Sequence, residues 1–168
     1  MFQKETYIYL NICMKIEIVE NSKRSLFVYK ENELYYSSTF KNNWLNRIVS
    51  IFNHNNELIL KVKIGGFFMD SSHQIQFEQT VDAFDIKRIN ESNIYLDKNR
   101  NLIKKYEERF ISLNWNYSYF LNKKKIADVK NTLWKTPLKI ILLIEDQNLE
   151  FLDSIIIHIL SSETGKTY

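Results

Sequence analysis

Residues 138–160 decide the expected fold, and they read LKIILLIEDQNLEFLDSIIIHIL. The first seven residues are nearly all apolar, which is typical of a β-strand buried on both faces. Residues 145–148 are acidic or amide side chains of the kind found at helix N-termini. Residues 149–160 are apolar around nearly the whole circumference of a helix, and such a helix must be enclosed by protein. The segment therefore predicts a buried strand followed by a central C-terminal helix.

Upstream of this segment, short extended runs alternate with short polar breaks. In residues 58–64, aliphatic side chains at even positions alternate with Lys61 and Lys63, as in a half-buried strand. Evenly spaced strands of this kind favour an all-β sandwich or barrel. The expected strands cover residues 14–19, 25–30, 34–38, 47–52, 58–64, 73–79, 93–97, 102–106, 111–121, 125–129 and 138–144.

The turns between these strands are made with very little glycine or proline. The chain has only 3 Gly and 1 Pro, so Asn-rich breaks such as residues 53–56 and 98–101 are expected to form the turns. Asn suits this role because it tolerates the left-handed conformation and bonds its own backbone. Residues 40–46 leave two alternatives open: a loop up to about Asn46 followed by a strand, or a short helix near Trp44.

The composition predicts one soluble globular domain over residues 1–168. Apolar residues make up 45% of the chain and charged residues 26%, which excludes a disordered chain. The 23 basic and 20 acidic residues leave a net charge of +3, which is too small to indicate nucleic-acid binding. The single cysteine, Cys13, excludes an intramolecular disulfide framework and a cysteine-cluster zinc site.

The two ends of the chain carry further expectations. Residues 1–13 lack the apolar stretch and cleavage site of a signal peptide, and they are either an edge strand or an extension. Residues 161–168 are predicted to be a flexible polar tail. The most apolar region, residues 138–160, is interrupted by acidic residues, so no transmembrane helix is expected. These features favour a cytoplasmic protein, peripheral at the membrane if it binds lipid.

Many hairpins followed by one thoroughly apolar terminal helix is an unusual combination. It resembles the tubby C-terminal-like superfamily, which includes the LURP-one-related proteins and the phospholipid scramblases. The resemblance rests on the hairpins of residues 48–64, 94–106 and 117–129 and on the closing pair 138–144 and 149–160. It implies a closed antiparallel β-barrel of about twelve strands around a buried hydrophobic C-terminal helix. The turns depart from the family pattern, since Asn and Lys stand in place of Asp-Gly.

A physical argument supports the same architecture. Closing a sheet removes its exposed edges, and the interior of a wide barrel must be filled. Residues 149–160 have the apolar circumference to fill it. The main alternative is a PH-like barrel capped by a C-terminal helix, which would need only one apolar face. A lipocalin-like barrel, which would leave its interior free for a ligand, is a further alternative.

No constellation of residues predicts catalysis. His54, His73 and His158 have no spacing that suggests a metal site or a triad, and His158 is expected to be a hydrogen-bonded core residue. Adjacent Glu107 and Glu108 would point to opposite faces of a strand. Residues 163–167 imitate the end of a phosphate-binding loop but lack its first glycine and its following helix. We therefore predict no enzyme activity, no metal and no cofactor.

Two groups of residues are candidate binding sites. A basic cluster on two neighbouring hairpins can attract anionic lipid headgroups or other anions, by about 1 kcal/mol per charge near a membrane surface. A second group beside Gly65 and Gly66 is a candidate membrane or partner tip, although such residues also commonly fold back onto a core. The basic cluster comprises Lys104, Lys105, Arg109, Lys123, Lys124 and Lys125, and the tip comprises Phe67, Phe68 and Met69.

These features together predict a non-catalytic binding or scaffold module that recognises a protein partner or an anionic membrane surface. No nucleic-acid partner is expected. Two alternatives remain open at this level. A carrier of a small apolar ligand would need an empty barrel, and a hydrolase would need residues gathered from distant strands.

Overall fold

The computed structural model describes residues 13–65, 72–78, 86–96, 101–108, 115–131 and 137–166. The strands are β1 (Cys13–Glu20), β2 (Leu26–Lys30), β3 (Glu33–Asn43), β4 (Asn46–Asn53), β5 (Leu58–Gly65), β6 (Ser72–Glu78), β7 (Ile86–Ile89), β8 (Asn93–Leu96), β9 (Leu102–Glu108), β10 (Trp115–Leu121), β11 (Lys124–Asn131) and β12 (Lys139–Glu145). A 3₁₀ helix, η2 (Asp146–Phe151), leads into the α-helix α1 (Leu152–Glu163).

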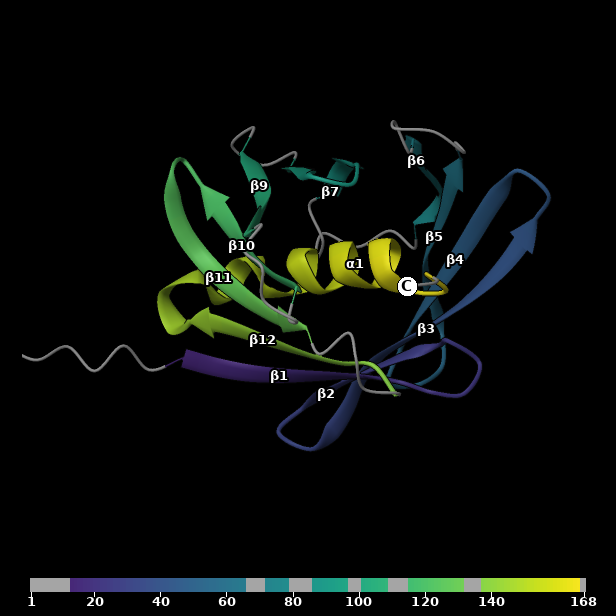
Figure 1. Cartoon of the computed structure of the whole chain (residues 1–168), viewed down its shortest axis with the longest axis horizontal. Helices are drawn as coiled ribbons and strands as arrows, with labels where there is room; N and C mark the ends of the chain where they lie inside the picture. The colour runs from purple at the N-terminus through teal and green to yellow at the C-terminus, as the bar shows by residue number, and fades with distance from the viewer. Residues whose placement is uncertain are drawn as a thin grey trace, which may run out of the picture.

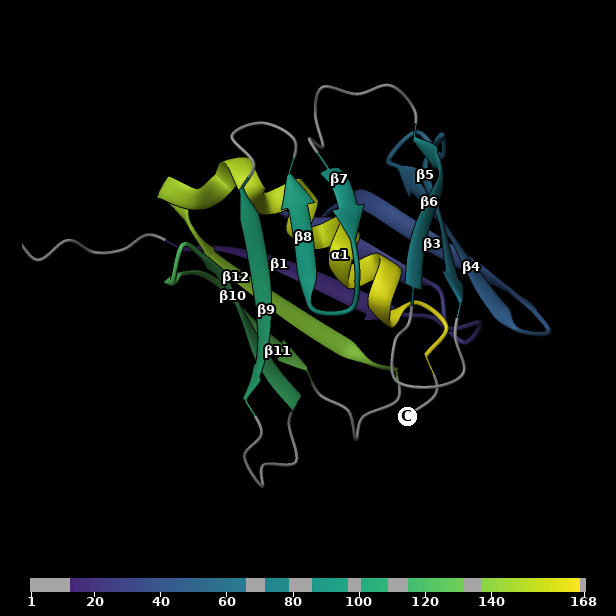
Figure 2. The same cartoon turned by 90° about the horizontal axis from the view of Figure 1, so that it is seen from above.

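All the strands belong to one antiparallel sheet of 12 strands, with β6 and β7 at its two ends. The two halves of the chain meet where β1 lies between β2 and β12. The sheet curls around α1 into a nearly closed barrel, and the helix lies inside it in both views (Figures 1 and 2). The predicted barrel with a buried C-terminal helix is confirmed. The PH-like alternative is not observed, because α1 is enclosed and does not cap an open end.

The core is the contact between α1 and the inward side chains of the strands. Ile155, Ile156, Ile157, Ile159 and Leu160 have no solvent exposure. They fill the interior, where alternate residues of each strand point. Burying an aliphatic side chain of this kind contributes about 1.5–3 kcal/mol, so the helix is a main source of the barrel's stability.

The prediction that residues 138–144 are buried on both faces is wrong. In β12, Ile140, Leu142 and Ile144 are fully buried, whereas Ile141 and Leu143 are half-buried. A barrel has a single interior, so only every second side chain of a strand can enter it. The outward residues of β12 are simply more apolar than their position requires.

The predicted polar tail is also wrong for residues 161–164, which are all buried. The α-helix continues to Glu163, and its polar end is paired inside the barrel. The hydroxyls of Ser38 and Thr164 lie 2.6 Å apart, and the Arg47 guanidinium donates to the Ser162 carbonyl at 3.0 Å. Residues 167–168 and 1–12 lie outside the described residues, and Cys13 is the first residue of β1.

Of the two alternatives for residues 40–46, the short helix is wrong, and the loop followed by a strand is correct for the strand that begins at Asn46 but too long for the loop. Strand β3 continues to Asn43 and β4 begins at Asn46, so Trp44 and Leu45 form a tight turn. Phe40 lies directly opposite Val49 across the hairpin. The helical spacing of the apolar residues therefore does not correspond to a helix, because Phe40 lies on a strand and Trp44 and Leu45 form the turn.

The sequence did not predict β7. This strand has only four residues, and its buried residues, Ile86 and Ile89, are separated by two exposed ones. A register shift between Ile86 and Arg88 removes the alternation that would identify it. The prediction of Asn-based turns is confirmed where the structure describes them, because Asn32, Asn56 and Asn122 have positive φ.

Candidate ligand-binding groove

The hairpin of β9 and β10 carries an open groove on the outer face of the barrel. The groove has a volume of about 580 Å³ and is lined by Leu102, Lys104, Tyr106, Phe120, Asn122 and Lys123. Strand alternation places the three β9 residues of this set on the same, outward side, and Lys104 lies directly opposite Phe120 on β10. Residues far apart in the sequence thus share one surface.

Two aromatic rings form the apolar part of the groove. The rings of Tyr106 and Phe120 meet edge to face, with centroids 5.2 Å apart and an angle of 89°, which is a favoured geometry for an aromatic pair. Tyr106 is 53% exposed. An exposed, rigid aromatic side chain beside a groove is typical of binding surfaces.

The cationic part of the groove comes from a strand and a turn. Asn122 and Lys123 both have positive φ, as the two central residues of a tight type I′ hairpin turn require. This turn joins β10 to β11 and presents Lys123 at the rim, while Lys104 extends from β9. Both lysines are exposed, so they are available to an anionic group.

The structure divides the predicted basic cluster. Lys104 and Lys123 line the groove, and Lys124 and Lys125 are exposed on the adjoining strand β11. Lys125 lies opposite Phe120, and its ammonium group is 2.8 Å from the Asp128 carboxylate. Arg109 lies outside the described residues.

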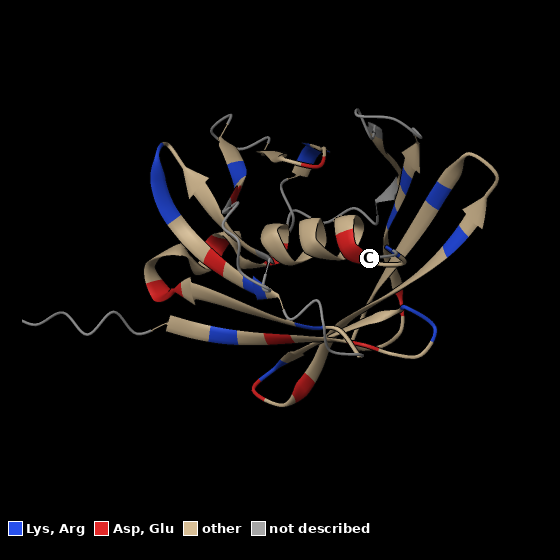
Figure 3. Ribbon diagram, viewed as in Figure 1, with Lys and Arg blue, Asp and Glu red and all other residues tan. Residues whose placement is uncertain are grey.

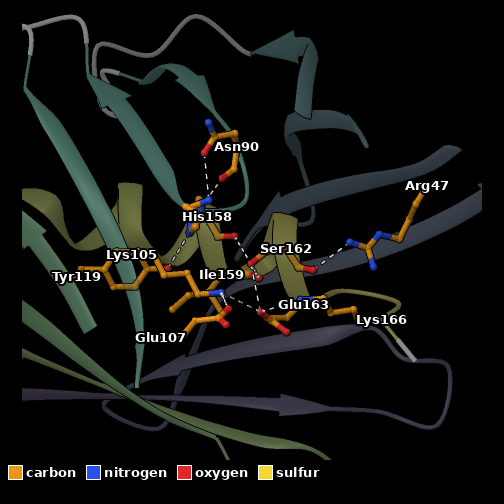
Figure 4. A network of polar contacts seen from close by, with 11 residues as sticks. Arg47, Asn90, Lys105, Glu107, Tyr119, His158, Ile159, Ser162, Glu163 and Lys166 are labelled. Atoms are coloured by element: carbon orange, nitrogen blue, oxygen red, sulfur yellow. Dashed lines mark hydrogen bonds and ion pairs between the residues drawn. The ribbon is translucent and has the colours of Figure 1, made fainter. Parts of the chain in front are cut away.

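Lys105 does not lie on this surface, because its side chain points into the barrel and is 4% exposed. Its ammonium group lies 3.3 Å from Oε1 of Glu107 and 3.8 Å from Oε1 of Glu163 (Figure 4). The centre of the Tyr117 ring lies 4.2 Å from the same ammonium group. Lys105 therefore neutralises the carboxylate at the C-terminal end of α1. The sequence-based prediction grouped Lys105 with Lys104 in one basic cluster. Strand alternation is the signal that could have separated them, because adjacent residues of a strand point to opposite faces.

His158 is the centre of a buried polar network. Its Nε2 lies 2.7 Å from the Asn90 carbonyl and its Nδ1 lies 2.8 Å from the Tyr119 hydroxyl (Figure 4). A carbonyl only accepts, so Nε2 carries the proton and the tyrosine donates to Nδ1. Burial lowers the pKa of His158 to about 3 and raises the pKa of Tyr119 well above its usual value. The expected role of His158 as a hydrogen-bonded core residue is confirmed.

The remaining candidates are distributed over the fold. His54 follows β4 in a turn and His73 lies on β6, and neither is among the described residues that line the β9–β10 groove. Among the described residues, no group of three or more His, Cys, Asp or Glu side chains could hold a metal ion. Within the same part of the chain, no helix has the length and apolar character needed to cross a bilayer.

The predicted tip of Phe67, Phe68 and Met69 lies outside the described residues. Its flanking residues Gly65 and Ser72 pair with each other.

Comparison with protein-family models, curated proteins and solved structures found no match for this chain.

Proposed function

We propose that this chain is a non-catalytic binding module of tubby-like architecture whose β9–β10 groove recognises an acidic segment of a protein partner. One observation carries the proposal: two exposed ammonium groups and two aromatic rings share one open groove. None of the described residues that line it is acidic. The tubby-like relationship is supported by the barrel around an enclosed C-terminal helix.

The energetics favour a ligand that is both acidic and apolar. An exposed ion pair contributes at most about 1 kcal/mol, so Lys104 and Lys123 alone would hold a simple anion weakly. Aromatic side chains supply most of the affinity at protein interfaces, and Tyr106 and Phe120 offer such anchors beside the lysines. A peptide with an aromatic residue between acidic residues meets both requirements.

The other classes of function are less well supported. A carrier of a small apolar ligand needs an empty barrel, and α1 occupies this interior with fully buried aliphatic side chains. A hydrolase needs a base and a nucleophile in one pocket, and the described lining of the groove holds no histidine or acidic residue.

The test is binding of a fluorescein-labelled peptide with one Trp between Glu residues, measured by fluorescence anisotropy. We expect the wild-type protein to bind this peptide more tightly than a matched peptide with Gln in place of Glu. Lys104→Glu combined with Lys123→Glu should weaken binding about tenfold, because both reversals place like charge at the ligand. The matched control is Lys23→Glu, at an exposed lysine between β1 and β2, which should bind as the wild type does.

Equal affinity for the Glu and Gln peptides would refute the proposal, as would an equal loss with Lys23→Glu. A second arm uses vesicles that contain phosphatidylserine. If these vesicles bind through Lys104 and Lys123 and the peptide does not, the anionic partner of the groove is a lipid headgroup and the protein partner is refuted.

A further inference from the structure

The hairpin of β3 and β4 ends in two large exposed apolar side chains. Trp44 is 97% exposed and Leu45 is 65% exposed, and the pair Asn43 and Asn46 closes the turn beneath them. The hairpin extends away from the barrel at the right of Figure 1. An almost fully exposed tryptophan contributes nothing to packing, so the fold does not explain it.

The backbone adds a second, independent observation. Trp44 has a φ of +33°, at the first central position of a two-residue hairpin turn. Glycine is the favoured residue at a position with this sign of φ, and a bulky side chain there is strained. Trp44 therefore stabilises the fold neither by its backbone conformation, which is strained, nor by its side chain, which is exposed. This points to a role outside the fold.

A basic collar lies directly behind the tip on the outer face of the sheet. Lys41 on β3, Ile48 on β4 and Lys63 on β5 lie side by side in one cross-strand row, and Lys61 follows two residues along β5 on the same face. Residues 39–50 and 58–65 contain no acidic residue, and Figure 3 marks the basic residues of these strands in blue. Arg47 is not part of the collar, because it points inward to the Ser162 carbonyl.

We propose that this tip is a membrane anchor, in which Trp44 and Leu45 enter the interface of an anionic bilayer. The basic collar of Lys41, Lys61 and Lys63 would contact the phosphates of the phospholipids. Tryptophan prefers the headgroup level of a bilayer, and juxtamembrane lysines are attracted to an anionic leaflet. The amides of Asn43 and Asn46 border the tip, so only two side chains enter and the anchoring is shallow and reversible.

A bilayer fits this surface better than a protein pocket does. A protein partner would need a preformed cavity that is complementary to the convex tip. A lipid interface is fluid and can accommodate the tip without such a cavity. A collar of one sign of charge matches a uniformly anionic surface.

The anchor does not depend on the groove. The β3–β4 tip and the β10–β11 turn beside the groove lie at opposite ends of the molecule in both views (Figures 1 and 2). A molecule held by its tip would leave the groove open to a partner.

The test is flotation of the full chain with vesicles of phosphatidylcholine alone and vesicles that also contain phosphatidylserine. We expect binding to the anionic vesicles and its loss in Trp44→Gly combined with Leu45→Ser. Because glycine suits the positive φ, Trp44→Gly alone should keep or raise the melting temperature, so loss of binding cannot be attributed to unfolding. Lys41→Gln and Lys63→Gln should each weaken binding about fivefold.

The control is Lys123→Gln in the groove, which should leave vesicle binding unchanged and so separates this proposal from the proposed function. In a Trp115→Phe and Trp134→Phe background, anionic vesicles should shift the remaining Trp44 emission to the blue. The proposal is overturned if wild-type protein does not float with anionic vesicles at low salt, or if Trp44→Gly combined with Leu45→Ser floats equally well. Dimerisation that is lost in Trp44→Gly, without vesicle binding, would instead assign the tip to a second copy of this chain.

Discussion

At the scale of single residues, a shift of one position along a strand determines whether a lysine is exposed or buried. Lys104 and Lys105 are adjacent and chemically identical, yet Lys104 is exposed in the groove and Lys105 is buried beside Glu163. A buried ammonium group is costly unless it is paired, and Lys105 has two carboxylates and an aromatic ring within reach. Removing Glu163 would leave the buried Lys105 ammonium group with Glu107 as its remaining carboxylate partner among these groups.

Gly165 is the residue at which a substitution should be most informative. Its φ is +74°, and an added Cβ would lie 2.5 Å from the ring of Phe40. We expect Gly165→Ala to destabilise the protein by more than the approximately 1–2 kcal/mol of the left-handed backbone alone, because the ring must also move. Urea unfolding measures this loss.

The two causes can be separated in a double-mutant cycle. In a Phe40→Ala background the steric part disappears, so the Gly165→Ala penalty should fall toward the backbone contribution. An unchanged penalty in that background would show that Phe40 does not confine Gly165.

At the scale of elements, α1 and β12 show why apolar content alone misleads. Both segments are almost entirely apolar, but α1 is buried on nearly every side whereas β12 is buried on one. A helix in the centre of a barrel meets side chains in every direction. A strand in the wall meets them only on its inner face.

This difference predicts unequal effects at neighbouring positions of β12. Leu142 is fully buried, so Leu142→Asp places an unpaired charge in the core and should unfold the protein. Leu143 is half-buried on the outer face, so Leu143→Asp should cost no more than about 1–2 kcal/mol. Circular dichroism with thermal unfolding compares the two variants, and similar melting temperatures would contradict the single-faced burial of β12.

At the scale of the whole molecule, the barrel carries a built-in dependence on pH. The folded state lowers the pKa of His158 from 6.5 to about 3, chiefly because burial disfavours the charged ring. The unfolded state therefore binds more protons between these values. The contribution of the neutral, buried His158 to the free energy of unfolding is therefore complete above pH 6.5, and it is lost as the pH falls toward 3.

The corresponding measurement is the free energy of unfolding in urea at pH 7.5 and pH 5, for wild type and His158→Gln. Wild type should lose about 2 kcal/mol more than the variant over this interval, since the carboxylates titrate in both proteins alike. Equal losses would mean that His158 is not held neutral in the folded state.

Local patterns in the sequence suffice to predict all the strands except β7, the Asn-based turns and the enclosed C-terminal helix. These features depend on local periodicity and on the apolar circumference of residues 149–160, which neighbouring residues alone reveal. Of the six basic residues that were predicted to form one cluster, Lys104 and Lys123 line the groove and Lys105 is buried.

Which side chains are accessible depends on the closed barrel and could not be predicted from these local patterns. In the barrel, Lys105 points inward and Lys104 outward, Tyr106 and Phe120 lie beside the lysines of the groove, and Trp44 lies at an exposed tip. Burial depends on which face of a strand the closed barrel encloses, and closure depends on pairings between distant segments such as β1 and β12. A local pattern predicts that side chains alternate along a strand, but only the closed barrel shows which of the two faces of the strand points to the interior.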